Sequence, residues 1–358
     1  MKNLNYLIVA VLLAVTLIVP DAMAHVGFAD MGLASVALIG MNTQMTPGQA
    51  RVVDPVLSSI AHGYKNPDVS RIGRVFFPRV PVPARGAKII KFGKEAFRLY
   101  NTRRAPGAAT KRVQYGYDAG AVALLQERLE GTVPVELMDE ASVIPGVDLA
   151  RGSVENVQEI FDRAEEYEQI GVLINANNYD ANHKISLGAG SQWDEDAPKI
   201  GKQIRDYKEA VRASTGRYPN KLGLAPNVFN ALAENPEIRE RFKFTSAESL
   251  TTKMLEAYFD IQEVVVGNDV YMDANAPDDA DFTDMIDNAA VLAFVPSAAR
   301  YNVPSFGYTY HLPGHPMVEA PYYDENSRSW MYPQTYERQV VHTGEGAGFL
   351  IQNVLANP

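Results

Sequence analysis

The chain of 358 residues contains no cysteine, so disulfide bonds and thiolate-bound metal sites are excluded. Common catalytic signatures are also missing: there is no HExxH and no GxSxG, and the glycine-rich stretch 344–348 has no P-loop lysine. The six histidines are scattered, and Pro-Gly, which breaks a helix, separates His311 from His315. These absences predict a protein that is not an enzyme and that binds no cofactor and no metal.

An excess of positive charge is missing as well. The formal net charge of −10 argues against a general nucleic-acid-binding surface. The contents of 46% hydrophobic and 21% charged residues are ordinary for a globular protein, and the length suffices for one core or two modest domains.

The only long apolar run stands at the amino terminus. Lys2 gives a positive start, residues 6–19 are apolar, and Ala-Met-Ala at 22–24 has the form of a cleavage site. The run is short for a membrane span. Read alone, this segment predicts a secretory signal and export.

The most interpretable stretch is residues 193–238. Apolar residues at helical spacing predict a helix that starts at Pro198 and ends at a left-handed Gly216. A turn at 218–220 and a short apolar strand at 222–224 follow. Pro226 then opens a second helix, which Asn235-Pro236 closes. The stretch predicts a compact α+β unit.

This order of segments resembles the central part of tailed-bacteriophage major capsid proteins. The resemblance rests on Trp193 and acidic residues before a helix, then Thr-Gly and Pro-Asn, the short strand, and the helix that ends in Asn-Pro. It extends through segment order over residues 54–358, about 85% of the chain. The family has the Hong Kong 97-like fold, an α+β fold that encapsulin shells share.

A basic segment precedes this unit. Residues 76–84 contain three prolines and suit an extended edge segment, and residues 85–112 hold nine basic side chains and one acid. Candidate strands at 88–92 and 111–115 flank a turn at Pro106-Gly107, which predicts a long projecting hairpin. Contact with a neighbouring subunit, a solvated loop and nucleic-acid binding are all compatible with it. The resemblance implies the first, because capsid proteins of this fold carry an extended loop here.

A long helix is predicted to follow, with Ser153 as its cap. An apolar stripe is predicted at spacings of three and four, and acidic residues from Glu155 to Glu166 occupy the other faces. The stripe consists of Val154, Val157, Phe161, Ala164, Tyr167 and Gly171. Twenty residues of helix would span roughly 30 Å. The resemblance implies the spine helix of the family.

Further elements are predicted toward the carboxyl end. A capping box at 245–248 begins a helix that includes Leu250 and Tyr258. Strands are predicted at 261–266, 270–272 and 289–295, and tyrosines such as Tyr308 and Tyr336 predict strands with aromatic cross-strand contacts.

Ten acidic and no basic residues lie between Met254 and Ala290. The cluster Asp278, Asp279, Asp281 and Asp284 does not follow the EF-hand order, although acidic clusters can attract calcium. A solvated loop is one interpretation, and a contact with a basic surface on a neighbouring copy is another. The residues of this hypothetical subunit interface are Lys88, Lys91, Arg98, Arg103, Arg104, Lys111, Arg112, Asp278, Asp279 and Asp281.

The resemblance gives the domain organisation that we expect. Its parts are a signal-like or mis-started segment (1–24), an amino-terminal arm (25–75), an extended hairpin loop (76–118), a peripheral domain with the spine helix (119–180), an axial domain (181–300) and a return to the peripheral domain (301–358).

The function implied is that of a phage head-shell protein. Many copies would form pentamers and hexamers that close into an icosahedral shell around DNA, without sequence-specific binding and without a membrane. Assembly would take place in the host cytoplasm, with scaffold, portal and decoration proteins as partners. An encapsulin-like compartment is one alternative, and an exported periplasmic binding protein is another if residues 1–24 are a true signal. A later start at Met31, Met41 or Met45, or removal of residues 1–40 in maturation, would reconcile the amino terminus with a capsid.

Overall fold

A computed structural model describes most of the chain beyond Arg51. The described residues are 53–64, 70–91, 102–103, 106–107, 112, 118–142, 147–195, 199–242, 250–277, 279–300, 303 and 305–357. The signal-like segment 1–24 and the alternative starts lie outside them.

The helix α6 (Leu149–Leu173) is 25 residues long. The Asp148 side chain caps it by accepting a hydrogen bond of 3.0 Å from the backbone N–H of Arg151. The expectation that Ser153 is the cap was wrong, because Asp148 provides a carboxylate acceptor one turn earlier. The predicted apolar stripe is confirmed in its first half, since Val154, Val157 and Phe161 are buried, and was wrong in its second half, since Ala164, Tyr167 and Gly171 are exposed.

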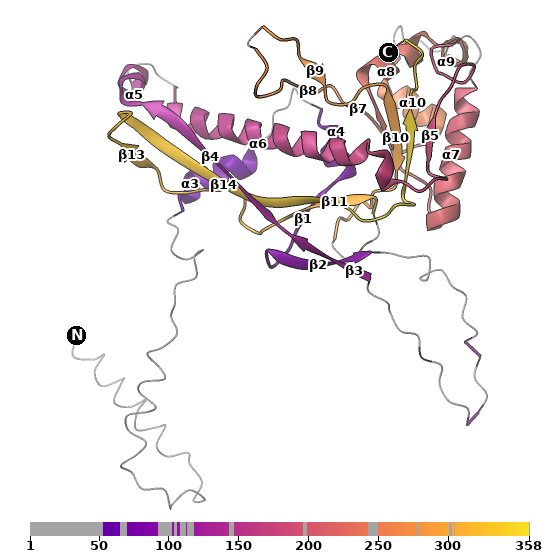
Figure 1. Cartoon of the computed structure of the whole chain (residues 1–358), viewed down its shortest axis with the longest axis horizontal. Helices are drawn as coiled ribbons and strands as arrows, with labels where there is room; N and C mark the ends of the chain where they lie inside the picture. Colours follow the sequence, from indigo (N-terminus) through magenta and orange to yellow (C-terminus); the bar gives the residue numbers. More distant parts are fainter. Residues whose placement is uncertain are drawn as a thin grey trace, which may run out of the picture. The chain divides into compact units, whose positions relative to one another are not determined.

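A six-stranded sheet lies against α6 (Figure 1). Its longest strand, β14, is antiparallel to β4 along one edge and to β13, β12 and β11 along the other, and β1 adds to β11 in parallel. The strands are β1 (Arg79–Pro81), β4 (Leu125–Pro134), β11 (Gly307–His311), β12 (Met317–Val318), β13 (Tyr322–Asp324) and β14 (Ser329–His342).

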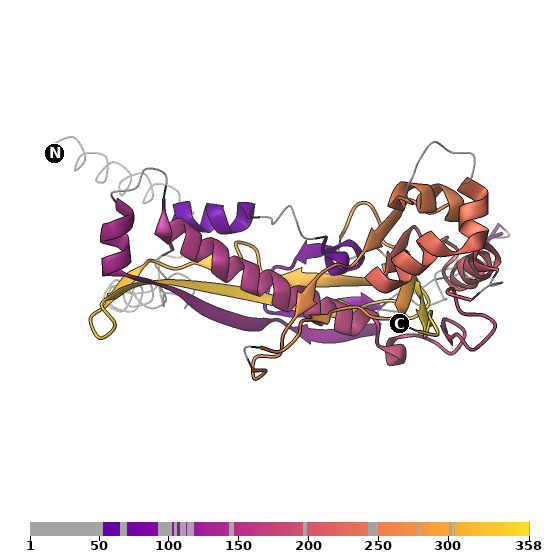
Figure 2. The ribbon, with the colours of Figure 1, turned by 90° about the horizontal axis from the view of Figure 1, so that it is seen from above.

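The predicted tyrosine-rich strands and the edge segment are therefore confirmed. Tyr323 of β13 and Trp330 of β14, with rings 5.8 Å apart, make a cross-strand contact, whereas Tyr308 and Tyr310, 5.9 Å apart, lie on the same strand β11. Figure 2 shows α6 along the β4–β14 pair. The rings of Phe161 in α6 and Tyr336 in β14 meet edge to face, with centroids 6.2 Å apart. The helices α3 (Pro55–Gly63) and α5 (Val135–Ser142) contact this layer.

A second sheet of five strands has the order β5-β15-β10-β6-β7. All five residues of β10 are buried, as the predicted strand at 289–295 requires. The strands are β5 (Lys184–Ser186), β6 (Lys221–Leu224), β7 (Glu263–Val266), β10 (Ala289–Ala293) and β15 (Gly348–Gln352). The accompanying helices are η3 (Ala176–Asn178), α7 (Ile200–Thr215), α8 (Pro226–Glu234), α9 (Pro236–Phe242) and α10 (Thr252–Phe259).

The local signals of this second layer are confirmed at several positions. Gly216 has φ +69° after α7, Pro226 stands at the start of α8, and Asn235 ends it. The helix expected to include Leu250 instead begins at Thr252, and the capping box 245–248 lies outside the described residues.

The last strand departs from the expected return of residues 301–358. β11 to β14 do lie in the sheet beside α6, but β15 pairs with β10 and β5 in the five-stranded sheet. Phe349, Leu350 and Ile351 are consecutive and buried, which suits a central strand covered on both faces.

Two short ribbons complete the fold. β2 (Gly86–Lys91) pairs with β3 (Asp118–Ala123), so the described partner strand lies later than the predicted strand at 111–115. Of that predicted strand only Arg112 is described. Gly107, with φ +83°, lies in a turn as predicted. β8 (Val270–Tyr271) pairs with β9 (Thr283–Asp284).

The cap of α6 can be tested by mutation. Asp148→Ala removes the acceptor for the Arg151 N–H, so we expect the free energy of unfolding to fall by about 1 kcal/mol. Ser153→Ala, at the cap position expected from the sequence, should change it by less than about 0.5 kcal/mol. Urea unfolding of both variants measures this, and equal losses would contradict Asp148 as the cap.

Candidate functional site

The basic residues of the hypothetical interface belong to the β2–β3 ribbon and the segment that joins its strands. Lys88 and Lys91 lie in β2, and Arg103 and Arg112 are exposed. Arg98, Arg104 and Lys111 lie outside the described residues. The described members therefore share one loop.

The acidic residues lie on a different element. Asp279 and Asp281 are exposed between β8 and β9, and Asp278 lies outside the described residues. Beside them Phe282 is 71% exposed, an unusual position for a large apolar side chain. The ring of Tyr271 packs 4.8 Å from that of Tyr167, which ties this hairpin to α6.

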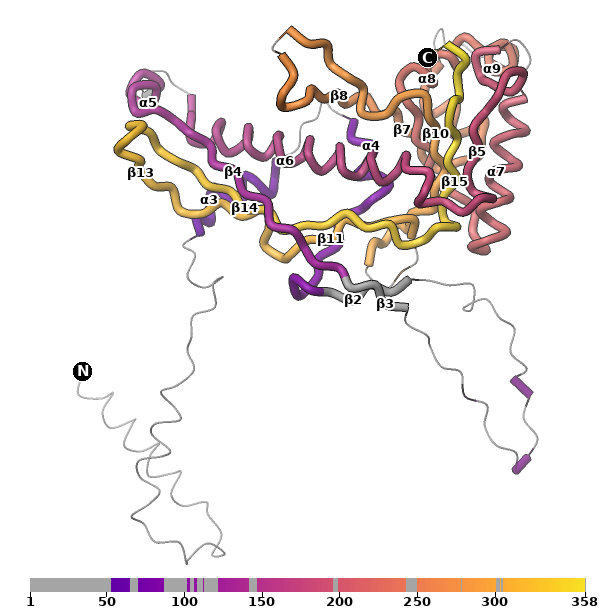
Figure 3. Tube along the Cα trace, in the orientation of Figure 1, coloured from indigo at the N-terminus to yellow at the C-terminus, as the bar shows by residue number. Residues whose placement is uncertain are grey.

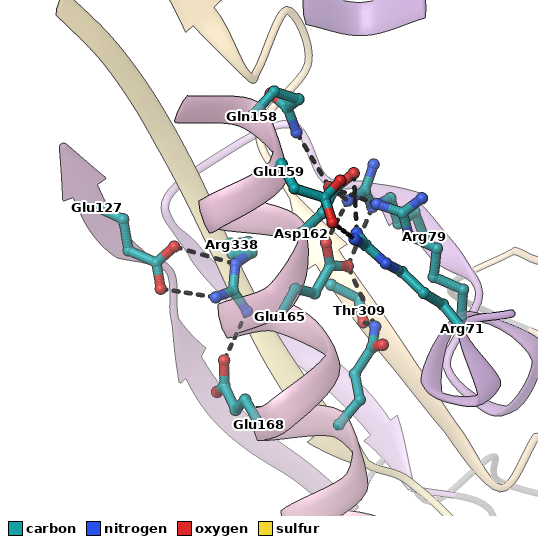
Figure 4. Close-up of polar contacts among 12 residues, drawn as sticks. Arg71, Arg79, Glu127, Gln158, Glu159, Asp162, Glu165, Glu168, Thr309 and Arg338 are labelled. Carbon is teal, nitrogen blue, oxygen red and sulfur yellow. Dashed lines mark hydrogen bonds and ion pairs between the residues drawn. The ribbon is translucent and has the colours of Figure 1, made fainter. Parts of the chain in front are cut away.

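A buried cluster of charged side chains was missed in the sequence. Asp162, Glu165 and Glu166 of α6 were expected on exposed faces, but each is at most 1% exposed. The Nε of Arg79 donates to Glu165 Oε1 (3.0 Å), and the Nη1 of Arg71 lies 3.1 Å from Asp162 Oδ2. Figure 4 shows these arginines reaching α6. Charges this deep need partners, because burial without them is costly.

The backbone of the arginine-bearing segment also binds α6. It includes the short helix α4 (Ile72–Phe76), whose Gly73 N–H donates to Glu166 Oε1 (2.7 Å). A Cβ at position 73 would collide with the side chains of Glu166 and Gln169, so only glycine allows this approach. Burial raises the pKa of the Glu166 carboxyl to about 7, and the negative charge of Asp269 adds to the shift.

A second arm of the cluster joins α6 to the sheet. Arg338 of β14 is 2% exposed and lies between two carboxylates. Its Nη2 donates to Glu127 Oε1 of β4 (2.8 Å), and its Nη1 donates to Glu168 Oε2 of α6 (2.6 Å). Gln169 Nε2 also donates to Thr309 Oγ1 of β11 (2.7 Å). The cluster therefore fixes both the position and the rotation of α6 on the sheet.

The other side of α4 contacts the five-stranded sheet. Added Cβ atoms at Gly223 of β6 and at Gly267 after β7 would collide with Ile72. The Nε of Arg71 also lies 3.8 Å from Asp269 Oδ2, in the turn after β7. The segment thus contacts α6 with its charges and the second sheet with its apolar side chains.

Within the described residues, no group of three or more histidine and acidic side chains is placed to hold a metal ion. No helix in the described part of the chain is long and apolar enough to span a membrane.

The buried Glu166 predicts a pH dependence of stability. Because its pKa rises from 4.5 to about 7 on folding, the folded subunit holds a proton that the unfolded chain loses, and stability falls as pH rises from about 4.5 to about 7. In Glu166→Gln the amide replaces the protonated carboxyl and still accepts from Gly73. We expect this variant to lack the slope and to exceed the parent at pH 8 by about 1–3 kcal/mol.

Urea unfolding of the unassembled subunit between pH 4.5 and 8 measures the effect. Glu155→Gln, on the same helix but in a partly exposed pair with Arg151, is the matched control and should keep the parental slope. Parallel pH curves for the parent and Glu166→Gln would contradict the raised pKa.

Known proteins with similar sequence or structure are phage proteins and encapsulins. The family described as phage major capsid protein E matches residues 165–331. The major capsid protein of Burkholderia phage BcepMu is 30% identical over 311 residues, which cover 85% of this chain and 97% of that protein. A phage-related protein from Bordetella bronchiseptica is 40% identical, with a TM-score of 0.74 and coverage of 87% of this chain and 99% of that chain.

An encapsulin from Synechococcus elongatus is similar in fold alone, with 14% identity and a TM-score of 0.50 over 84% of this chain and 96% of that chain. The expected Hong Kong 97-like fold is therefore confirmed, and the identities favour phage capsids over encapsulins. The chain belongs to the family of phage major capsid proteins and is a structural component of a phage capsid.

Proposed function

We propose that many copies of this chain form pentamers and hexamers that close into an icosahedral shell around phage DNA. The observation that carries this is the 30% identity to the BcepMu major capsid protein over almost its whole length. The net charge of −10 suits a shell whose DNA must fill the interior without sticking to it. Assembly would take place in the host cytoplasm, with scaffold, portal and decoration proteins as partners.

The proposed domain organisation follows the family. Residues 25–75 serve as the amino-terminal arm and 76–118 as the extended loop; 119–180 and 181–300 form the peripheral and axial domains. Residues 301–358 return to the peripheral domain, except that β15 contributes to the axial sheet.

The contact between copies that we propose joins the basic loop of one subunit to the acidic hairpin of the next. The loop segment 85–112 holds nine basic residues against one acid, and the acidic segment 255–289 holds no base. The described members Arg103, Arg112, Asp279 and Asp281 are all exposed. Opposite charge would set the register and speed of association more than its affinity.

Charge reversal tests this contact. Arg103→Glu with Arg104→Glu places like charges against the acidic hairpin, so we expect shells to be lost or reduced at least tenfold in electron micrographs while the subunit stays folded. Reversal of exposed Lys202 and Arg205 on α7 is the matched control and should leave assembly intact. Normal shells from the first variant would overturn the contact.

A restoring variant sharpens the result. Asp279→Lys with Asp281→Lys should also block assembly alone, and combining both reversals should restore it at least in part, because the attraction returns with its signs exchanged. Loss without restoration would point to damage of each surface rather than to their pairing.

The amino terminus is tested by the same imaging. The export alternative rests on residues 1–24, whereas a capsid subunit should assemble from a chain that starts at Met41. We expect closed shells tens of nanometres across, or flat hexameric sheets, from that shortened chain. Monomers only, with cleavage after Ala24 in the full chain and periplasmic location, would favour the exported binding protein.

A further inference from the structure

The strand β4 forms one rim of the six-stranded sheet. It pairs along its ten residues with β14, whose opposite edge is occupied by β11, β12 and β13. Figure 3 traces β4 beside β14 toward α5. Among the residues that the structure describes, no strand pairs with the outer edge of β4. A regular edge of this length is a template for another strand.

Two leucines are exposed along this rim, between polar and charged side chains. Leu125 is 59% exposed and Leu129 is 40% exposed. Ile160 of α6 is 44% exposed and lies on the same face of the helix as Glu168. That face points toward β4, because Arg338 donates hydrogen bonds both to Glu168 and to Glu127 of β4. Proline, which would block an added strand, occurs in β4 only at its last position.

Alternation along β4 limits how a second copy could pair with it. Glu127 meets Arg338 and Glu168 of α6, and a Cβ on Gly131 would meet Ser153 of α6. Odd-numbered residues therefore face α6, and even-numbered residues face away. Directly opposed residues of two paired strands point to the same face of the sheet. If the α6 helices of both copies lie on the same face of the joined sheet, odd-numbered residues of one β4 must therefore oppose odd-numbered residues of the other, because a slip by one residue would reverse the faces.

One antiparallel register also satisfies the charges. Within one copy, the Nη2 of Arg128 already lies 3.0 Å from Glu130 Oε1. With Leu129 opposite its own counterpart, Arg128 of each copy also lies opposite Glu130 of the other, once on each side of the axis. A shift by two residues in either direction instead opposes Arg128 to Arg128 or Glu130 to Glu130, which is unfavourable. The strand is thus self-complementary about Leu129, as the interface at a two-fold axis requires.

We propose that β4 pairs with β4 of a second copy about a two-fold axis at Leu129, so that two six-stranded sheets become one continuous sheet. The proposal rests on the proposed function in that a closed shell brings copies together about two-fold axes. Leu125 then meets Val133 of the other copy, and Glu127, already paired with Arg338, meets only Gly131.

The absence of cysteine allows a direct test. Leu129→Cys places one thiol in each copy at a directly opposed pair, about 4.5–5.5 Å apart between Cα atoms and within the range of a disulfide. Thr132→Cys, exposed on the same strand, is the matched control, because its counterpart would lie roughly 20 Å away. Mild oxidation of assembled particles and a non-reducing gel should convert most Leu129→Cys chains to dimers and few Thr132→Cys chains.

Charge exchange in the Leu129→Cys background tests the register. Arg128→Glu opposes two carboxylates on each side of the axis, so the dimer yield should fall several-fold. Arg128→Glu with Glu130→Arg restores opposite charges and should restore the yield. If the yield of disulfide-linked dimers is the same in all of these variants, the proposed register is wrong.

The outcomes separate this proposal from the proposed function. Closed shells in which Leu129→Cys gives no dimers would overturn the β4 contact and leave the shell function standing. Dimers without shells from any variant would support the contact and count against the shell. Neither shells nor dimers would overturn both, and equal crosslinking of Leu129→Cys and Thr132→Cys would show random collisions and overturn the contact.

Discussion

The buried ionic contact between α6 and the arginines of residues 71–79 is the constraint on which the rest of the fold depends. Three carboxylates of α6 are withdrawn from water. The charges of Asp162 and Glu165 are acceptable only while Arg71, Arg74 and Arg79 reach them, whereas Glu166 accepts from the Gly73 N–H and has a raised pKa. Such networks contribute little net stability compared with apolar packing, but breaking one leaves an unpaired buried charge. They therefore select one position for the helix. Here the selected position lays α6 along β4 and β14, where Arg338 holds it from the other side.

The same segment links the two sheets. Its charged side binds α6, and its apolar side, through Ile72 and Phe76, fills space that Gly223 leaves open in β6. The two layers are not joined only by loops, since one short helix is packed into both. A change in the angle between the sheets would have to alter the contacts of α4 or the charge state around Glu166.

The sequence predicted what short-range chemistry controls. Gly216, Pro226 and Asn235 act on their own neighbours, so α7 and α8 were placed almost to the residue. The segment order also led to the correct family. Long-range partners were not predictable. The acidic residues of α6 were expected on exposed faces because their arginine partners lie about 80 residues earlier in the chain: Arg79 is 83 residues from Asp162 and 86 residues from Glu165. The strand β15 was placed with the wrong sheet for the same reason, because its apolar residues show that it is buried but not beside which strands. Of the ten expected interface residues, Arg103, Arg112, Asp279 and Asp281 are exposed, and their role remains a proposal.

The proposed contacts use separate parts of the subunit. The described residues at the centre of the charge contact, Arg103, Arg112, Asp279 and Asp281, are exposed and charged. A contact between such charges would weaken with salt, which suits initial association and correct choice of neighbour. The edge of β4 offers backbone hydrogen bonds and leucine contacts, which are directional and depend on exact register. The first kind of contact can form before the second is aligned. In a shell that repeats both contacts by symmetry, a misplaced subunit could therefore dissociate while only the reversible charge contacts hold it. The shell would become rigid only where two β4 strands pair in the register that opposes unlike charges and keeps the odd-numbered residues on the α6 face.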